Sequence, residues 1–152
     1  MPLLGKVKKI EVKGYDIEWK IENFSNLEKD GICYYSPEFS YADESWFLGI
    51  DPNGDNYNDS FGYINLYLYR KSSGSPINLK FSLSIKSVNG MKNHERHCSG
   101  TFEQWNHHQF LRFISISELQ ERKVGLLPSD VLTIVCTIQN STSTENTSKY
   151  CV

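Results

Sequence analysis

Short stretches in which apolar and polar residues alternate run along most of the chain, and turn-forming residues separate them. Alternation with a period of two is typical of strands that bury one face and expose the other. We expect strands at residues 15–21, 36–39, 45–50, 62–69, 78–88, 97–102, 110–114 and 131–138. Residues 117–123 suggest a helical turn with Ser117 as its N-cap. The pattern predicts an all-β fold, an antiparallel β-sandwich of seven to eight strands.

Residues 61–69 are the most informative stretch, because the two faces of the expected strand differ in chemistry. The aliphatic face, which we expect in the core, consists of Ile64, Leu66 and Leu68. The other face, which we expect on the outside of the sheet, consists of Phe61, Tyr63, Asn65, Tyr67 and Tyr69. Aromatic residues in such a row either pack across neighbouring strands or form a platform for a partner protein. The alternation leaves both interpretations open.

The length of the chain, 152 residues, suits a single domain with one core. We assign residues 1–14 to an N-terminal arm and residues 15–138 to the domain. Residues 139–152 are polar and have no apolar period, which predicts a disordered tail. Because no coiled-coil heptad is present, we expect a monomer.

Composition and charge exclude several classes of function. The formal net charge of −2 provides no positive field for a phosphate backbone, so nucleic-acid binding is not expected. No apolar run reaches the roughly 18 residues that span a bilayer, and the N-terminus lacks the apolar stretch of a signal peptide. The four cysteines form no closely spaced pair, so neither a zinc ribbon nor a disulfide framework is indicated. We therefore expect an intracellular protein, in the cytoplasm or nucleus, with free thiols and no membrane association.

Histidine and cysteine are concentrated in one part of the chain, as His94, His97, Cys98, His107 and His108. A structural zinc site normally uses two spaced pairs of ligands, whereas the last two histidines are adjacent and point to opposite faces of an extended chain. A metal site is therefore not expected. The sequence also contains no nucleophile elbow, no zinc-protease motif and no phosphate-binding glycine loop. We expect a protein that is not an enzyme and uses no cofactor.

Three motifs resemble those of MATH (TRAF-like) domains. Residues 19–25, WKIENFS, resemble the W-x-I-x-N-F-S opening of these domains, and residues 125–136, GLLPSDVLTIVC, resemble their G-L-L-P-D-D-x-L-T-L-x-C closing strand. Residues 63–68, YINLYL, are similar to a Y-L-S-L-Y-L strand of the speckle-type POZ protein group. The spacing is nearly collinear over residues 15–138. The chain is identified as a member of the MATH family, with the speckle-type group as the most similar subgroup.

The resemblance implies a TRAF-like sandwich that binds short, extended, Ser/Thr-containing peptides across one sheet. In the speckle-type group the domain recruits substrates to a cullin-based ubiquitin ligase through a BTB (POZ) domain that follows it. The implied partners are therefore short linear motifs in other proteins. Carried over by position, the peptide-binding residues would be Tyr63, Tyr67, Phe81 and Phe110. Alternation independently places Tyr63 and Tyr67 on the outer face, whereas it groups Phe81 with the core.

The chain departs from the family pattern at the floor of the expected groove. A D-W-G-F motif is replaced by residues 107–110, HHQF, so that His108 takes the tryptophan position. If the loop before it carries an insertion, Trp105 supplies the missing indole. A further aromatic position is occupied by Gly100, and two flanking lysines are absent. These changes predict a peptide-binding groove that is less apolar and less basic.

Two other functions stay open beside that of a substrate adaptor. The tyrosine row and the sheet edges could pair with a second copy, which would make the domain a structural self-association module. The domain could also be the binding part of a deubiquitinase or protease whose catalytic part is not in this sequence.

Overall fold

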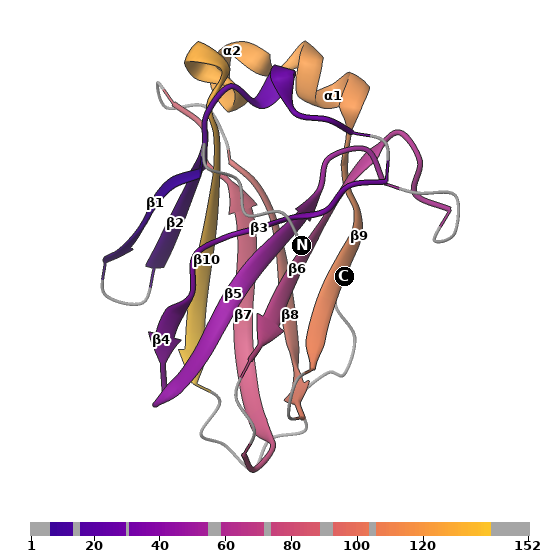
Figure 1. Cartoon of the computed structure of the whole chain (residues 1–152). Coiled ribbons are helices and arrows are strands. Elements are labelled where there is room, and N and C mark those ends of the chain that lie inside the picture. The colour runs from indigo at the N-terminus through magenta and orange to yellow at the C-terminus, as the bar shows by residue number, and fades with distance from the viewer. Residues whose placement is uncertain are drawn as a thin grey trace.

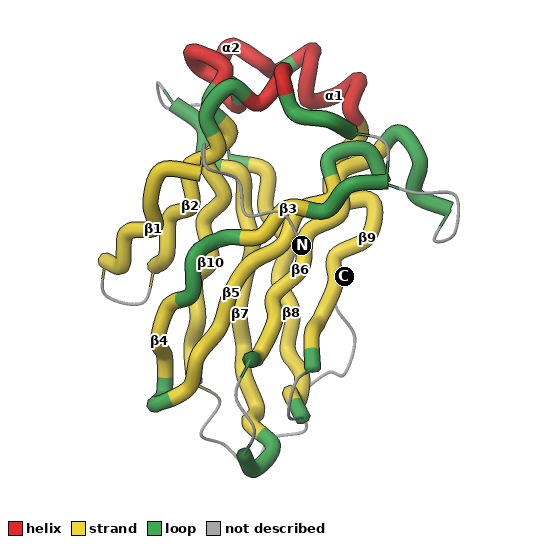
Figure 2. The backbone as a smooth tube through the Cα atoms, in the orientation of Figure 1, coloured by secondary structure: helices red, strands yellow, loops and turns green. Residues whose placement is uncertain are grey.

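Two antiparallel β-sheets pack face to face in the computed structural model, and short helices cover one end of the resulting sandwich (Figure 1). The structure describes residues 7–13, 16–29, 31–54, 59–71, 74–88, 93–103 and 106–140. For residues 7–13 and 140 it describes the backbone alone. Strands make up most of the body, while turns and helices lie at its ends (Figure 2). The predicted antiparallel sandwich is confirmed.

The first sheet contains five strands in the order β1-β2-β10-β7-β8. They are β1 (Val7–Lys13), β2 (Asp16–Ile21), β10 (Leu132–Asn140), β7 (Ile77–Ile85) and β8 (His94–Phe102). Strand β10 lies between β2 and β7, where Ile134 pairs with Trp19 on one side and with Ile85 on the other. The opening and closing motifs of the sequence are therefore neighbours in the sheet.

The second sheet has the order β3-β5-β6-β9, with β4 also paired to β5. Its strands are β3 (Tyr34–Tyr35), β4 (Phe39–Tyr41), β5 (Glu44–Asp51), β6 (Tyr63–Arg70) and β9 (His107–Ser115). Strand β6 is hydrogen-bonded on both sides, to β5 and to β9. Strands β8 and β9 are the edge strands of their sheets and lie next to each other along one open side of the sandwich.

Helices α1 (Ile116–Glu121) and α2 (Lys123–Leu126) cover one end of the sandwich, together with short 3-10 turns at Phe24–Asn26 and Pro128–Asp130 (Figure 1). The side chain of Ser115 caps α1 by accepting a hydrogen bond from the backbone N–H of Glu118 at 3.0 Å. The helical turn predicted at residues 117–123 is therefore present, but its cap is Ser115 rather than Ser117.

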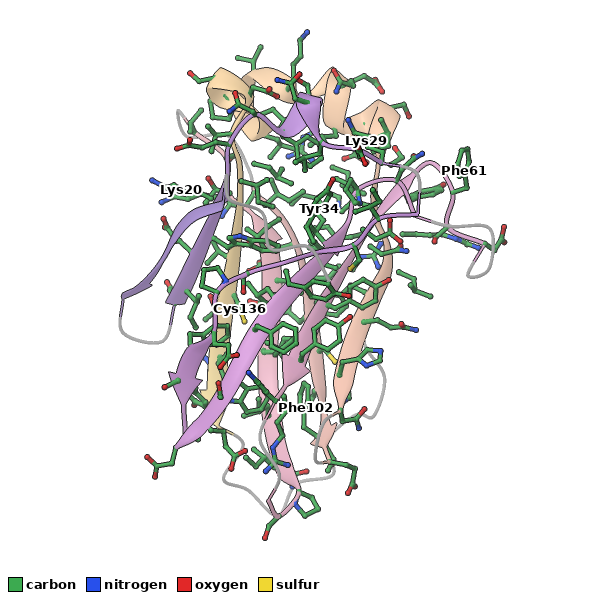
Figure 3. The ribbon with its side chains drawn as sticks, in the orientation of Figure 1. Lys20, Lys29, Tyr34, Phe61, Phe102 and Cys136 are labelled. Carbon is green, nitrogen blue, oxygen red and sulfur yellow. The ribbon has the colours of Figure 1, made fainter. Side chains whose placement is uncertain are left out.

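The core lies between the two sheets, and β6 supplies Ile64, Leu66 and Leu68 to it, each at most 1% exposed. This confirms the assignment of the aliphatic face. Arg70 follows on the same face and is also buried, with Nε 2.8 Å from Glu44 Oε1 and Nη1 donating to the Phe102 carbonyl oxygen at 3.0 Å. The ring of Phe102 lies inside the body, toward the end of the sandwich opposite the helices, whereas Phe61 projects from a loop into solvent (Figure 3).

Several predicted boundaries are wrong. Residues 7–13 were expected in an N-terminal arm, but they form β1 because their backbone pairs with β2. The strand expected at residues 36–39 is replaced by the shorter β3 and β4, which pair with different parts of β5. Strand β10 continues through Asn140, two residues into the expected tail, because Gln139 and Asn140 pair with β7. Residues 141–152 lie outside the described residues.

The expectation of free thiols holds for Cys33 and Cys136 but is wrong for Cys98, which takes part in a disulfide. Disulfides depend on proximity in space, which the spacing of cysteines along the chain does not report. The cysteine pattern therefore no longer supports a reducing compartment. In the part of the chain that the structure describes, no helix is long and apolar enough to cross a membrane.

Truncating the core face of β6 tests its assignment. We expect Leu66→Ala to lower the free energy of unfolding by about 2–5 kcal/mol, because it opens a cavity beneath a strand that is fixed on both sides. Phe61→Ala serves as the control, since Phe61 is 63% exposed and should change stability little. Denaturant melts of both variants measure the difference. Equal stabilities would contradict the face assignment.

Candidate functional site

The solvent side of the second sheet carries a row of aromatic side chains that crosses four strands. These residues, which we call the aromatic face, are Tyr35 on β3, Phe47 on β5, Tyr67 and Tyr69 on β6, and His107 on β9. By contrast, the outer positions of β7 in the other sheet hold Lys80, Ser82 and Ser84. Aromatic side chains at the surface thus gather on one of the two sheets.

The rings of the aromatic face pack against one another across the strands. Tyr69 lies at the centre: its ring stacks on Phe47 at 4.7 Å between centroids with an interplanar angle of 8°, and it lies 5.0 Å from His107. Tyr35 meets Tyr69 edge-on at 5.7 Å, and Tyr67 lies 5.9 Å from Tyr69. Contacts of this kind add to the stability of the sheet beyond the area they bury. The interpretation that the rings pack across neighbouring strands is therefore confirmed.

Gly49 allows the rings of Tyr35 and Tyr69 to close over β5. A Cβ atom at this position would lie 2.9 Å from Tyr69 Cε2 and 3.5 Å from the Tyr35 ring. The absence of a side chain here lets Tyr69 lean across the sheet toward Tyr35. Gly49 thus sets the shape of the aromatic face.

The hydroxyl groups of Tyr35 and Tyr69 stay protonated at neutral pH. Burial raises the pKa of Tyr35 to about 12, and it also raises the pKa of Tyr69, whose side chain is hydrogen-bonded to Tyr35. Tyr35 is in turn hydrogen-bonded to Cys33, whose thiol pKa is raised to about 11, again mainly by burial. After burial, the hydrogen bond to Cys33 is the next largest cause that raises the pKa of Tyr35, and the charge of Asp51 adds a smaller contribution to the pKa shifts of both residues. The hydroxyls are therefore available as neutral hydrogen-bonding groups.

His107 adds an imidazole at the border of the aromatic face. Its ring packs against Tyr67 and Tyr69, and this partial burial, followed by the proximity of His108, lowers its pKa below 6.5. At pH 7 the ring is therefore predominantly neutral. The aromatic face is therefore aromatic and polar rather than basic.

The structure brings only one of the expected peptide-binding residues into the centre of this surface. Tyr67 belongs to the aromatic face, although its neighbours leave it only 8% exposed. Tyr63 is partly exposed but lies beyond Asn65, whose buried side chain donates to Ser60 Oγ and accepts from the backbone N–H of Arg112. Tyr63 therefore lies outside the aromatic face, on the far side of Asn65 from Tyr67.

Phe81 and Phe110 lie in the core rather than on an open groove floor. They are 4% and 2% exposed, and their rings pack together at 5.7 Å. The reason is strand phase: Phe110 pairs with the core residue Leu66, and Phe81 points inward from β7. Their expected direct contact with a peptide is not compatible with these positions. Trp105 lies outside the described residues.

His108 also points away from the aromatic face, into the gap between β9 and β8. Its ring lies 4.1 Å from the Phe102 ring, and its Nε2 donates to the Thr101 carbonyl oxygen at 2.9 Å. A Cβ atom on Gly100 would lie 2.6 Å from His108 Cε1. The two departures from the family pattern are therefore one feature, since Gly100 makes room for the imidazole that replaces tryptophan.

The histidine and cysteine cluster of the sequence is only partly kept together in the fold, where Cys98 Sγ lies 4.0 Å from His108 Nδ1. His94 Nε2 lies 2.7 Å from the Phe113 carbonyl oxygen, His97 is exposed beside Glu95, and Cys98 is in a disulfide. Among the described residues, no group of three or more His, Cys, Asp or Glu side chains is placed to hold a metal ion.

Sequence reasoning missed Tyr35 and Phe47 as members of the aromatic face, and Gly49 as the residue that lets the Tyr69 ring close over β5. A signal for Phe47 was present, because Trp46, Leu48 and Ile50 alternate with it and occupy the core. Tyr35 and Gly49 gave no comparable signal, since their role depends on the pairing of β3 with β5. His107 was named in the histidine and cysteine cluster and in the HHQF segment of the expected groove, but not as a neighbour of Tyr69.

Comparison with known proteins agrees with the fold and the sequence motifs. A profile described as "MATH domain" matches residues 16–138 of the chain. The chain is also similar to "TD and POZ domain-containing protein 2" of Mus musculus, with 31% identity over 137 residues. This alignment covers 85% of the present chain and 37% of that relative, so the chain spans little more than a third of the relative's length.

The sandwich and the match over most of its length define the class: this chain belongs to the MATH domain family. The domain is a protein-interaction module related to proteins that also carry a POZ domain.

Gly49→Ala tests the packing of the aromatic face. We expect the added methyl group to displace the Tyr69 ring and to destabilise the fold by about 1–3 kcal/mol. In a Tyr69→Leu background the same change should cost much less, because the clash is gone. Denaturant melts of the four proteins in this double-mutant cycle measure the coupling. An equal cost of Gly49→Ala in both backgrounds would show that the two residues do not touch.

The lowered pKa of His107 predicts a pH dependence of stability. The folded protein binds this proton less readily than the unfolded chain, so the contribution is fully present above about pH 6.5 and is lost as the pH falls through the lower folded-state pKa. We expect His107→Gln to reduce the loss of melting temperature between about pH 7.5 and about pH 5.5 relative to the wild type. Identical pH profiles for the two proteins would rule out His107 as a contributor.

Proposed function

We propose that this domain recognises short, extended segments of partner proteins, among them Ser/Thr-containing segments, on the aromatic face and the adjoining edge of β9. The observation that carries the proposal is the position of Tyr67 and Tyr69 directly beside the edge strand β9, which itself carries His107. Surface rings are the side chains that protein interfaces use most for binding energy. An edge strand adds main-chain donors and acceptors for an extended peptide.

The chemistry of the aromatic face suits Ser and Thr side chains. The hydroxyls of Tyr35 and Tyr69 and the neutral imidazole of His107 can each donate or accept hydrogen bonds. The rings around them offer apolar contact to the methyl group of Thr. A strongly acidic or phosphorylated segment finds no lysine or arginine on the aromatic face itself.

By analogy with the POZ-domain relative, we propose that the domain serves as a substrate adaptor for ubiquitination in the cytoplasm or nucleus. A BTB (POZ) domain in the same protein would connect it to a cullin-based ligase. The proposal assigns binding alone to this domain and no catalytic residue. The free domain is expected to act as a monomer with one peptide site.

Tyr67→Ala tests the proposed site. We expect it to weaken binding of a Ser/Thr-rich peptide by at least about tenfold, since truncating an aromatic anchor removes its contact area. The test peptides come from an array of Ser/Thr-containing sequences, and the tightest binder is titrated by fluorescence anisotropy. Phe61→Ala is the matched control, because it removes an aromatic ring that lies away from the aromatic face. Unchanged affinity in Tyr67→Ala, with the fold intact, would contradict the proposed site.

A further inference from the structure

Strand β9 contains a bulge that changes the character of its outer edge. The strand advances from Phe110 to Ile114 while its partner β6 moves only from Leu66 to Ile64. Arg112, inside the bulge, has a left-handed backbone with φ 52°. Bulges of this kind commonly end strand pairing or redirect side chains beside a binding site.

Side chains of β8 occupy the carbonyl groups of this bulge. Arg96 Nη1 donates to the Leu111 carbonyl oxygen at 2.9 Å, and Arg96 Nη2 donates to those of Arg112 and Phe113, the latter at 3.3 Å. The guanidinium also lies over the Phe113 ring, 5.4 Å from its centroid. His94 Nε2 approaches the same Phe113 carbonyl at 2.7 Å. Because these acceptors are already used, this half of the β9 edge cannot pair fully with another strand.

A second contact runs in the reverse direction, from a side chain of β9 to the backbone of β8 near the C-terminal end of β8. His108 of β9 donates to the Thr101 carbonyl oxygen of β8, as described above. The two edge strands thus use each other's side chains to close their edges, at Thr101 on one strand and at residues 111–113 on the other.

Between these contacts lie residues 107–111 of β9, which we call the window. Alternate residues of this segment direct their main-chain groups away from β6. The N–H of Arg70 donates to the Asn106 carbonyl oxygen at 2.8 Å, so by alternation the main-chain groups of His107 and Gln109 point away from β6. The His107 N–H is taken by the Asn106 side chain at 2.8 Å. Within the described residues, the groups that no hydrogen bond occupies are the His107 carbonyl, both main-chain groups of Gln109 and the Leu111 N–H. This window borders the aromatic face at Tyr67, which is paired with Gln109.

We propose that Arg96 is a positioning residue that limits strand addition on β9 to the window centred on Gln109, and so fixes the register and length of the extended partner peptide. This inference rests on the proposed function. A peptide that pairs with the window places alternate side chains over the aromatic face, and only about three to five of its residues can join the ladder. Beyond Leu111 a longer peptide meets the guanidinium of Arg96 instead of free carbonyls.

The length dependence of binding tests this role. The probes are fluorescent Thr-Val-Ser-Thr-Ser and versions lengthened by Ser-Thr pairs at either end to about seven and nine residues. In the wild type the longest probe should bind no more than about twofold tighter than the shortest. In Arg96→Met, which keeps an unbranched apolar cover on Phe113 but cannot donate, lengthening at one end should improve affinity about fivefold or more, since Leu111 then offers both of its main-chain groups.

Arg112→Met is the matched control: its guanidinium pairs with Asp59 on the surface, so the wild-type length profile should be kept. If Arg96→Met does not fold, Arg96→Lys replaces it, because a single ammonium cannot serve three carbonyls and an intermediate length gain is expected. Binding in the wild type with the same length profile in the Arg96 variants overturns the inference and leaves the proposed function intact. Absence of binding for every probe contradicts the proposed function, and the inference falls with it.

Discussion

The double pairing of β6 is the constraint on which the rest of the structure depends. Because β5 and β9 hold this strand from both sides, its side chains have no freedom to exchange faces. Ile64, Leu66 and Leu68 enter the core, and Tyr67 and Tyr69 must then stand on the solvent side. A packed interior and an aromatic surface are thus two consequences of one strand. The strand beneath this surface is paired on both sides from Leu66 to Tyr69, the part that carries Tyr67 and Tyr69.

The second sheet ends in an edge strand next to the aromatic face. Strand β9 borders the aromatic face, and its neighbour β8 closes part of the β9 edge through Arg96 and His94. Unprotected edges invite pairing with other chains, so a protein that uses an edge for binding benefits from restricting the usable part. In this domain the restricted edge and the aromatic rings meet at Gln109. Under the proposed function, main-chain and side-chain contacts to a peptide would both be made at this position.

The sequence predicted the parts of the fold that depend on local pattern. Alternation identified β6 and its two faces, and the end motifs identified the family. What the sequence could not show depends on pairing between distant segments. The inward positions of Phe110 and His108 follow from the register of β9 against β6, and the bulge in that pairing has no signature in the local pattern. The prediction of an arm at residues 7–13 is wrong because the lysines there hide a strand that only its pairing with β2 reveals.

The departures from the family pattern also have a spatial explanation that spacing alone could not supply. Gly100 and His108 are separated in sequence but touch in the fold, so one change accommodates the other. Together with Thr101 they hold β8 and β9 in contact at the end of the window. At the position of the family's tryptophan, His108 thus makes a polar contact between the two edge strands.

A backbone amide NMR titration with the Thr-Val-Ser-Thr-Ser peptide tests the central claim most directly, because it locates binding without any mutation. The account predicts that shift changes concentrate at His107, Gln109 and Leu111 of β9 and at Tyr67 and Tyr69 of β6. The amides of Lys80, Ser82 and Ser84, on the other sheet, should stay unchanged. Shift changes centred on those β7 residues, with β9 unaffected, would place the binding surface on the opposite side of the sandwich and contradict the account.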